Sequence, residues 1–567
     1  MADEGGRDGE GCLPVITPAR RGNSLKYKSK TLLSTVEPAG RAEKAAEKVP
    51  QMERTLYFCP SPLFGYGLEQ FLSRLNPGSA ILCVETDEKL LSLSVSQAAG
   101  RVFSHPRLLL TGEKNPAALC ALVRKTWGGR AFRRVIPLKL NGGWQLDAEV
   151  YAGMEAALAD DIAIEWGNAM TLVKLGRRYA RNTIRNLSAL CQSRELPGFF
   201  NESDPVLVLG AGPSLDGFLN ALAERVSSRN REVTVPGKLP FRIICVDTCI
   251  PVLLERGIRP DLAVVLESQF WNVRDFIGGR NSRIPAAFDL SAYPATTGLL
   301  GGETFFFLTP WTGLALLGRI AECFPLPVFP PLGSVGLTAV ALAKKLTKGP
   351  ILAAGMDFSF TLDATHARGS PGHAASLQNQ NRFRGLINAE AAFRKGVFQT
   401  VSKTGVTVFS NPAMRTYRNL FQEEFSKDKN IHDIRGTGLP LGLAALSAPE
   451  ALDALFGGGR QTAALPPPRK AQADGGRSPQ DREKFAAFAG KELGMLRELR
   501  EILSGGRNTA RIPRLLSDLD YLWSHFPEYA GAAGKKPSAS DTGFLKRVRA
   551  EIDPFRRLWE LLLDAVT

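Results

Sequence analysis

The chain has 567 residues, of which 44% are hydrophobic, so it is long enough for several folded domains with apolar cores. Lys and Arg number 71 against 56 Asp and Glu, which gives a net charge of +15. The cations are spread along the chain rather than gathered in an aromatic-rich arm, so we expect no nucleic acid partner. No apolar run approaches the ~18 residues of a membrane span, and the acidic, glycine-rich start is unlike a signal peptide. We therefore expect a cytoplasmic protein without an integral membrane segment.

The eight cysteines are scattered, and several lie in apolar runs such as IICVDTC. They form no CxxC pair and no spacing typical of zinc ligands. We therefore expect buried free thiols in a reducing compartment, and no metal site.

The first two segments of the chain differ in apolar periodicity. Residues 1–50 carry many Gly, Arg, Lys and Glu with little periodicity, and we expect them to be disordered. Residues 51–195 predict a Rossmann-like N-terminal domain, with a strand at Leu56–Cys59, a glycine turn, a helix over Leu68–Leu75 and a second strand that ends in Glu85. This is the layout of a nucleotide-binding βαβ unit, in which the carboxylate binds a ribose hydroxyl. Only two glycines of the fingerprint are present, so a domain without a ligand is the alternative.

A long helix from about Trp166 to Leu196 is predicted to link this domain to the next, with its Arg and Lys on a solvated face or beside an anionic ligand. In residues 196–450, strands alternate with helices, which predicts an α/β domain with a doubly wound, mostly parallel sheet. The predicted strands include VLVLG, FRIICVD, LAVVLE, TFFFLT, PVFPP and PILAAGMD. Residues 451–484 are rich in Gly, Pro and polar residues and predict a linker, and residues 485–567 predict a C-terminal helical bundle.

The stretch VLVLGAGPSLD contains the strongest signal of a binding site. Its glycines allow a sharp turn after a strand, its proline suits the first helical position, and its serine offers a hydroxyl and an N–H. A loop of this kind at a helix N-terminus favours an anion such as phosphate. The Pro-Ser after the glycines is unlike the dinucleotide motif, and the Lys-Ser/Thr of a P-loop is missing, so neither NAD nor a Walker-type ATP site is indicated. The predicted anion-binding residues are Gly210, Gly212, Pro213, Ser214 and Leu215.

Further polar residues follow other strands of the same domain. Asp247 and Glu267 each end a predicted strand, and Ser334 stands at the start of a helix, where a plain N-cap is the alternative. Asp357 follows a strand, with His366 in the loop beyond it. Because ligands bind at the carboxyl ends of parallel strands, we expect these residues to share one site.

Four motifs in this order, GAGPSL, GIRPDLAVVLES, GSVGLTAVALAKKL and GMDFSF…THARG, resemble the motility-associated factor (Maf) glycosyltransferases and their MptE-like domain. VFSNPAMRTYRNLFQEEF and IHDIRGTGLPLGL look like later segments of the same domain, so the resemblance covers about residues 200–445, and residues 55–170 are like the family's N-terminal region. A weaker similarity links the loop to bacterial sialyltransferases. Members of the family transfer sialic-acid-like nonulosonic acids to Ser and Thr of flagellin.

The resemblance implies a CMP-activated sugar as donor substrate, flagellin as acceptor protein, and no resident cofactor or metal. The donor phosphate would lie on the glycine loop, with Asp247 near the nucleoside. His366 would be the general base, with Asp357 beside it at the catalytic centre and His373 as the rival base. Arg368 would support the anionic donor.

Two departures from the family pattern concern substrate fit. Met356 stands where the family has Gln, and Glu267 stands where it has Asp.

Two other functions are the alternatives. A pterin pyrophosphokinase-like phosphotransferase would share the GAGPSL loop, but the VLESQF run has one carboxylate where Mg²⁺ would need several. The second alternative function is that of a non-catalytic flagellin-binding protein.

Overall fold

The computed structural model describes residues 13–97, 102–196, 200–229, 239–383, 385, 389–457, 479–531 and 540–566. The chain divides into two compact units, one of Met1–Leu175 with Ser524–Asp541 and the other of Gly176–Trp523 with Thr542–Thr567. None of the helices in the described ranges combines the length and the apolar character that crossing a membrane requires.

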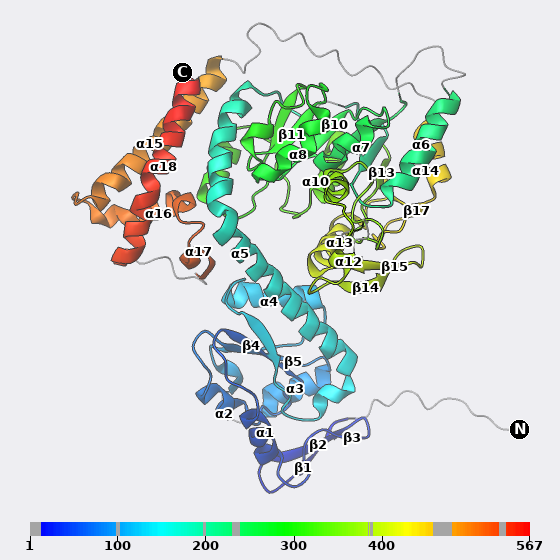
Figure 1. Cartoon of the computed structure of the whole chain (residues 1–567). Coiled ribbons are helices and arrows are strands. Elements are labelled where there is room, and N and C mark those ends of the chain that lie inside the picture. The colour runs from blue at the N-terminus through cyan, green and yellow to red at the C-terminus, as the bar shows by residue number, and fades with distance from the viewer. Residues whose placement is uncertain are drawn as a thin grey trace, which may run out of the picture. The chain divides into compact units, whose positions relative to one another are not determined.

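The first unit contains the predicted Rossmann-like domain. Its parallel sheet has the strand order β6-β5-β4-β7. The strands are β4 (Thr55–Pro60), β5 (Ala80–Val84), β6 (Leu108–Thr111) and β7 (Arg134–Pro137), and the helices between them are α2 (Leu68–Ser73), α3 (Glu88–Gln97) and α4 (Pro116–Trp127) (Figure 1). The strand and helix predicted after residue 51 are therefore confirmed.

The prediction of disorder over residues 1–50 is wrong from residue 13 onward, and residues 1–12 lie outside the described ranges. The segment forms a small antiparallel sheet and a helix, namely β1 (Val15–Pro18), β2 (Asn23–Tyr27), β3 (Lys30–Thr31) and α1 (Pro38–Glu47). Leu25, Tyr27 and Leu32 are buried against Phe64 and Leu90. These few apolar residues are too widely spaced to show periodicity, and packing on the neighbouring domain gives them their order.

The linking helix α5 (Ala148–Gln192) is much longer than predicted. Its first half carries Tyr151, Met154 and Leu158, which are buried in the core of the N-terminal sheet. Its second half belongs to the other unit, because the boundary falls between Leu175 and Gly176 rather than at residue 195. One continuous helix thus takes part in two cores, which its uniform periodicity did not reveal.

The second unit is built on a parallel sheet with the order β12-β11-β10-β9-β8-β13-β16-β17. The strands are β8 (Val206–Leu209), β9 (Arg242–Val246), β10 (Leu262–Val265), β11 (Ala286–Asp289), β12 (Thr304–Phe307), β13 (Ile351–Ala354), β16 (Ile431–Ile434) and β17 (Ala445–Leu446) (Figure 1). The helices are α6 (Leu215–Arg229), α7 (Ile250–Leu254), α8 (Val273–Phe276), α9 (Ala315–Cys323), α10 (Val335–Leu346), α11 (Pro371–Gln378), α12 (Ala389–Ala392), α13 (Pro412–Phe425) and α14 (Ala448–Phe456), and a hairpin joins β14 (Phe398–Val401) to β15 (Thr407–Ser410).

The predicted α/β class and doubly wound parallel sheet are confirmed. Two details differ from the prediction. The strands β11, β16 and β17 were not predicted, and PVFPP forms only an isolated bridge between Leu308 and Val328 because its prolines lack the N–H groups of a full ladder. The strand order reverses between β8 and β13, so the topological switch point, where ligands bind in open α/β sheets, lies between these two strands.

The C-terminal region is helical, as predicted. It comprises α15 (Pro479–Leu503), α16 (Ile512–Asp518), α17 (Pro527–Gly531) and α18 (Thr542–Val566), with α15 and α18 side by side (Figure 1). The predicted linker bounds of residues 451–484 are wrong at both ends, because α14 continues to Phe456 and α15 begins at Pro479, while residues 458–478 lie outside the described ranges. A capping box at Ser447 and the buried Leu452 and Leu455 stabilise α14.

The prediction of a separate domain over residues 485–567 is also wrong, because most of these helices belong to the same unit as the central sheet. The buried Glu492 of α15 accepts a hydrogen bond of 2.8 Å from Arg319 of α9. The ring of Phe485 stacks on Phe324 with centroids 4.1 Å apart. Buried contacts of this kind hold the helices on the central domain, whereas the polar linker in the sequence indicated independence.

Candidate functional site

The glycines of the GAGPSL loop allow the chain after β8 to touch the chain after β13. A Cβ atom on Gly210 would lie 2.6 Å from the carbonyl oxygen of Gly355, and one on Gly212 would lie equally close to that oxygen and to Oδ2 of Asp357. Gly355 itself has a φ of +69°, which disfavours other residues. The loop is therefore glycine-rich because two backbone segments meet at the switch point.

Ser214 and Asp357, predicted from two separate motifs, form a hydrogen-bonded pair. The Ser214 N–H donates to Oδ2 of Asp357 at 2.7 Å, and the Ser214 hydroxyl donates to Oδ1 at 2.5 Å. Asp357 is 3% exposed, and this burial raises the pKa of its carboxyl group, while the two bonds from Ser214 act in the opposite direction. The position that the sequence assigned to a phosphate thus holds a carboxylate of the chain itself.

The amides of Gly210, Gly212 and Leu215 also have acceptors within the protein. The N–H groups of Gly210 and Gly212 donate to the carbonyl oxygens of residues 354 and 355, and the N–H of Leu215 donates to the carbonyl of Gly212. Pro213 has no N–H to offer. The predicted phosphate contacts therefore stay a prediction, and in this conformation the Ser214 amide would be available to a ligand only if Asp357 moved.

Several residues at this edge were missed by the sequence analysis. Lys403 binds both carboxylate oxygens of Asp433 at 2.6 and 2.7 Å, and its charge also lowers the pKa of Asp357. Burial raises the pKa of Asp433 to about 6. A Cβ atom on Gly436 would lie 2.5 Å from Cβ of Ser214, and one on Gly438 would lie 2.6 Å from Cα of Asp357. The glycines of IHDIRGTG could have been noticed in the sequence, whereas Lys403 carries no sequence signal.

The loop after β13 brings His366 to the same edge. The Ala367 N–H donates to the carbonyl of Ala211, inside the GAGPSL loop, at 3.0 Å. The next N–H, of Arg368, donates to Asp216 at 3.0 Å. Two hollows of about 310 and 370 Å³ border this loop and share Arg368 and His373. His366, Asp363, Thr365 and Ser376 line the smaller one, and Glu255, Arg256, Gly369 and Leu377 line the larger one.

Hydrogen bonding distinguishes the two candidate bases. Nδ1 of His373 accepts from the Gly369 N–H at 3.3 Å, so the neutral ring carries its proton on Nε2 and can only donate there. Nδ1 of His366 lies 3.2 Å from the Thr365 hydroxyl, which can accept its proton and leave Nε2 free to take another. Neighbouring protein atoms exclude part of the water around the His366 ring, and this desolvation lowers its pKa from the ordinary 6.5. The residue as a whole is still exposed. Of the two histidines, His366 alone can therefore keep its hydrogen bond while Nε2 stays unprotonated.

Asp247 lies in a second polar cluster, at the ends of β9 and β10. Nδ2 of Asn272 donates to Asp247 at 2.7 Å and to Asp275 at 3.1 Å. Burial, followed by the charge of Asp275, raises the pKa of Asp247 to about 7, and the nearby Glu267 adds to this effect. Glu267 is exposed, and its carboxylate accepts from the Gln269 N–H at 2.9 Å. Within the described ranges, no three His, Cys, Asp or Glu side chains are grouped so that they could hold a metal ion.

Ser334 begins α10 next to the switch point. It occupies the N-cap position, but its hydroxyl makes no capping hydrogen bond. The helix start packs on Met356, because a Cβ atom on Gly336 would lie 2.7 Å from the Met356 sulfur. The Met356 sulfur thus fills the space beside the first turn of α10. The structure brings Ser334 to the edge of the site without assigning it a partner.

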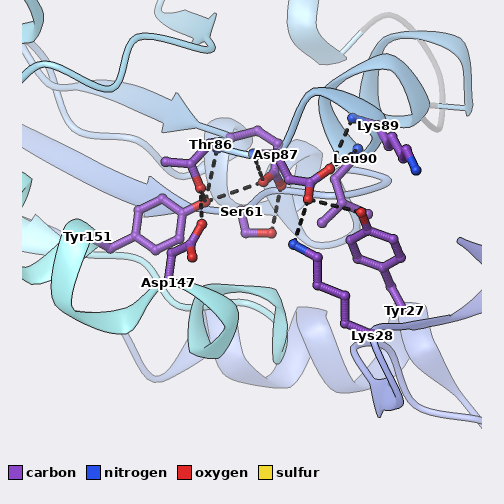
Figure 2. Close-up of polar contacts among 10 residues, drawn as sticks. Tyr27, Lys28, Ser61, Thr86, Asp87, Lys89, Leu90, Asp147 and Tyr151 are labelled. Atoms are coloured by element: carbon purple, nitrogen blue, oxygen red, sulfur yellow. Dashed lines mark hydrogen bonds and ion pairs between the residues drawn. The ribbon is translucent and has the colours of Figure 1, made fainter. Parts of the chain in front are cut away.

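The carboxyl edge of the N-terminal sheet is occupied by the protein's own side chains. Glu85 is 2% exposed and accepts hydrogen bonds from the Ser61 hydroxyl at 2.7 Å and the Tyr151 hydroxyl at 3.3 Å. Burial raises its pKa to about 7. Figure 2 shows Ser61, Tyr151 and Thr86 converging here, while Lys28 reaches the neighbouring Asp87. The residue predicted to bind a ribose is thus used internally, which supports the alternative of a domain without a ligand.

Known proteins resemble this chain in sequence and in fold. Residues 181–363 match the family described as 6-hydroxymethylpterin diphosphokinase MptE-like. Residues 181–363 thus resemble an MptE-like domain. It is 28% identical over 564 residues to an uncharacterized protein of Treponema pallidum (strain Nichols), which covers 96% of this chain and 95% of the relative.

The chain also has the fold of a Maf glycosyltransferase. The structure of the Maf glycosyltransferase from Magnetospirillum magneticum AMB-1 superposes with a TM-score of 0.53, covers 98% of this chain and 90% of that one, and is 14% identical in sequence. The resemblance drawn from the four motifs is therefore confirmed for the domain and the fold.

Proposed function

We propose that the chain is a protein O-glycosyltransferase that moves a nonulosonic sugar from a CMP-activated donor to Ser or Thr hydroxyls of flagellin. The observation that carries the proposal is the position of His366, an exposed histidine in a hollow whose loop is bonded to the GAGPSL loop at the switch point. The Maf glycosyltransferase-like fold of the whole chain supports it.

In the proposed reaction, Nε2 of His366 takes the proton of the acceptor hydroxyl as its oxygen attacks the anomeric carbon of the sugar. The bond from that carbon to the CMP phosphate breaks, and CMP leaves with the electron pair. His373 is held in the tautomer that donates from Nε2, so it would stabilise negative charge rather than accept a proton. Arg368, which lines both hollows, would attract the anionic donor.

In this proposal, Asp357 is a positioning residue as well as a candidate for the catalytic centre. It holds Ser214 and the first turn of α6 in place, and the donor phosphate would reach the loop only by replacing this carboxylate at the Ser214 amide. Asp247 is turned toward Asn272, so a nucleoside contact would need one of these hydrogen bonds to be exchanged. Glu267 is the exposed carboxylate of that cluster and would be the first to meet the nucleoside.

The proposal is tested by incubating the purified chain with flagellin and CMP-nonulosonate and measuring the intact mass of flagellin. A mass increase of one sugar per modified site, absent with His366→Ala, is the expected result. Flagellin of unchanged mass with every nonulosonate donor, from a chain that binds flagellin, would favour the non-catalytic alternative.

A second candidate is a 6-hydroxymethylpterin diphosphokinase, and the family match to residues 181–363 favours it. Asp275 joins Asp247 and Glu267 at the strand ends, so this edge is more acidic than the VLESQF run indicated. Calorimetry with ATP and Mg²⁺ against CMP distinguishes the two. Tight, Mg²⁺-dependent ATP binding together with diphosphate transfer to the pterin would replace the glycosyltransferase proposal.

A further inference from the structure

The two halves of α5 carry opposite charges. From residue 166 to residue 192 the helix has five cationic side chains and no carboxylate: Lys174, Arg177, Arg178, Arg181 and Arg185. From residue 148 to residue 165 it has carboxylates and no cation: Glu149, Glu155, Asp160, Asp161 and Glu165. The basic half lies in the second unit from residue 176 onward.

Helix electrostatics do not account for this distribution. Cations stabilise a helix through its dipole within the last turn, and the last turn of α5 has no basic residue. Arg177, Arg181 and Arg185 are spaced four residues apart, and like charges at this spacing destabilise a helix. A row of arginines that costs helix stability is better explained by an interaction than by the fold.

The three arginines stand on one helix face, at intervals of about 6 Å along the axis. Arg177 pairs with Glu551 of α18 at 2.8 Å and is 42% exposed, and Arg185 is exposed. The Nε atom of Arg181 is buried and has no hydrogen-bond acceptor in the described part of the chain. Partial burial lowers the pKa of Arg181, and the charges of Arg185 and Arg177 add to this, whereas Glu551 opposes it. Arg181 therefore has two other guanidinium groups and the Glu551 carboxylate in its surroundings.

We propose that Arg177, Arg181 and Arg185 form a binding site for an acidic segment of a partner polypeptide. Guanidinium groups bind carboxylates through two parallel hydrogen bonds, and a carboxylate between two arginines would relieve their repulsion. Carboxylates on every fourth residue of a helix, or on every second residue of an extended strand, recur at about 6–7 Å and match the row.

The surroundings of the row favour a polypeptide over a nucleic acid. Single-stranded nucleic acids bind where basic groups alternate with exposed aromatic rings that stack on the bases. Tyr179, the tyrosine within the row, is half-buried and lies against Trp311 with ring centroids 5.0 Å apart. The site does not depend on the proposed glycosyl transfer, since no residue of the switch-point edge takes part in it.

The test uses the full-length chain and a labelled synthetic helical peptide with glutamate at every fourth position, and its counterpart with glutamine. We expect the glutamate peptide to bind and the glutamine peptide not to bind by fluorescence anisotropy, with affinity that falls as salt rises. Arg181→Gln/Arg185→Gln should weaken binding by about tenfold. The control Lys427→Gln/Lys429→Gln removes the same charge from two exposed positions outside α5 and should change it by less than about twofold.

Thermal unfolding separates recognition from a structural role. Because the row repels itself, Arg181→Gln/Arg185→Gln should leave the melting temperature unchanged or raise it. A lower melting temperature, equal losses of affinity in the two double variants, or absence of peptide binding would overturn the proposal. So would tighter binding of a single-stranded oligonucleotide that depends on the same two arginines. Activity on flagellin is not part of the readout, so failure here leaves the proposed function standing.

Discussion

Each of the two parallel sheets buries a carboxylate against a serine hydroxyl at its carboxyl edge. In the N-terminal sheet Ser61 donates to Glu85 at 2.7 Å, and in the central sheet Ser214 donates to Asp357 at 2.5 Å. The surroundings differ. Glu85 is also bonded to Tyr151 and is enclosed, whereas the chain after Asp357 continues into a hollow lined by His366. The same local pair therefore closes one edge and forms the floor of a candidate site at the other.

The difference teaches that a closely packed glycine and a carboxylate at a strand end do not by themselves indicate a ligand. In the N-terminal sheet, a Cβ atom on Gly143 would lie 2.2 Å from the Ser61 hydroxyl. In the central sheet, a Cβ atom on Gly212 would lie 2.6 Å from Asp357. Both glycines permit close packing of the chain on itself. The edge of the central sheet differs because the loop that carries His366 and Arg368 follows Asp357 there.

The largest expected effect tests whether catalysis takes place at the carboxyl edge of the central sheet. His366→Ala should bind donor nearly normally and lose about 10²–10⁴-fold in kcat, because the proton moves only in the transition state. Since the pKa of His366 is lowered, wild-type activity should fall to half only below pH 6.5. The measurement is the rate of flagellin mass increase against pH.

Two controls accompany that experiment. His373→Ala should have a much smaller effect, and Ser61→Ala, at the other sheet, should leave kcat unchanged. If His373→Ala abolishes turnover while His366→Ala does not, the assignment of the tautomers is wrong. Equal loss from Ser61→Ala would mean that the two edges are not functionally distinct.

The next largest effect concerns the enclosed carboxylate. The pKa of Glu85 is raised from 4.5 to about 7, so the folded state binds this proton more tightly than the unfolded state does. Its contribution to stability is fully present below pH 4.5 and is lost as pH rises toward 7, which amounts to about 3 kcal/mol. Urea unfolding from pH 4.5 to 8 should show a steeper loss of stability in the wild type than in Glu85→Gln, in which the raised pKa values of Asp247 and Asp433 still contribute. Parallel profiles for the two proteins would contradict the assignment.

A smaller effect is expected for the close approach at the switch point. Gly212→Ala should destabilise the chain by about 1–3 kcal/mol, because its Cβ atom would overlap Asp357 and the Gly355 carbonyl. Gly217→Ala is a matched control in the same segment, with nothing within 4 Å of the added atom, and should be neutral or stabilising by up to about 1 kcal/mol. Chemical denaturation compares the two. Similar stabilities would show that the loop has room to move.

The smallest effect distinguishes the two serines. Ser214→Ala and Ser61→Ala each remove one hydrogen bond to a buried carboxylate, at a cost of about 1–2 kcal/mol in the free energy of unfolding. Both changes should raise the pKa of the bonded carboxyl further. Only Ser214→Ala should also weaken CMP binding in calorimetry. Unchanged CMP affinity would remove Ser214 from the donor site and leave it a purely structural residue.

The sequence by itself determined the class of the fold and the order of its parts. Buried strands such as VLVL and LAVV alternate with helices at local spacings, and local spacing is what periodicity records. The motifs also placed Ser214, Asp357 and His366 at the carboxyl edge of one sheet, because a parallel sheet brings all its strand ends together.

Only the tertiary structure decided which of these groups remain free for a ligand. Asp357 occupies the Ser214 amide, and Glu85 is enclosed by Tyr151, through contacts between residues distant in sequence. The ion pair of Lys403 and the docking of α15 through Glu492 were likewise not predictable, because a buried ion pair depends on a partner that no local pattern names. Hydrogen bonding and desolvation are set by all neighbours in space, so the occupancy of a site is a property of the folded chain.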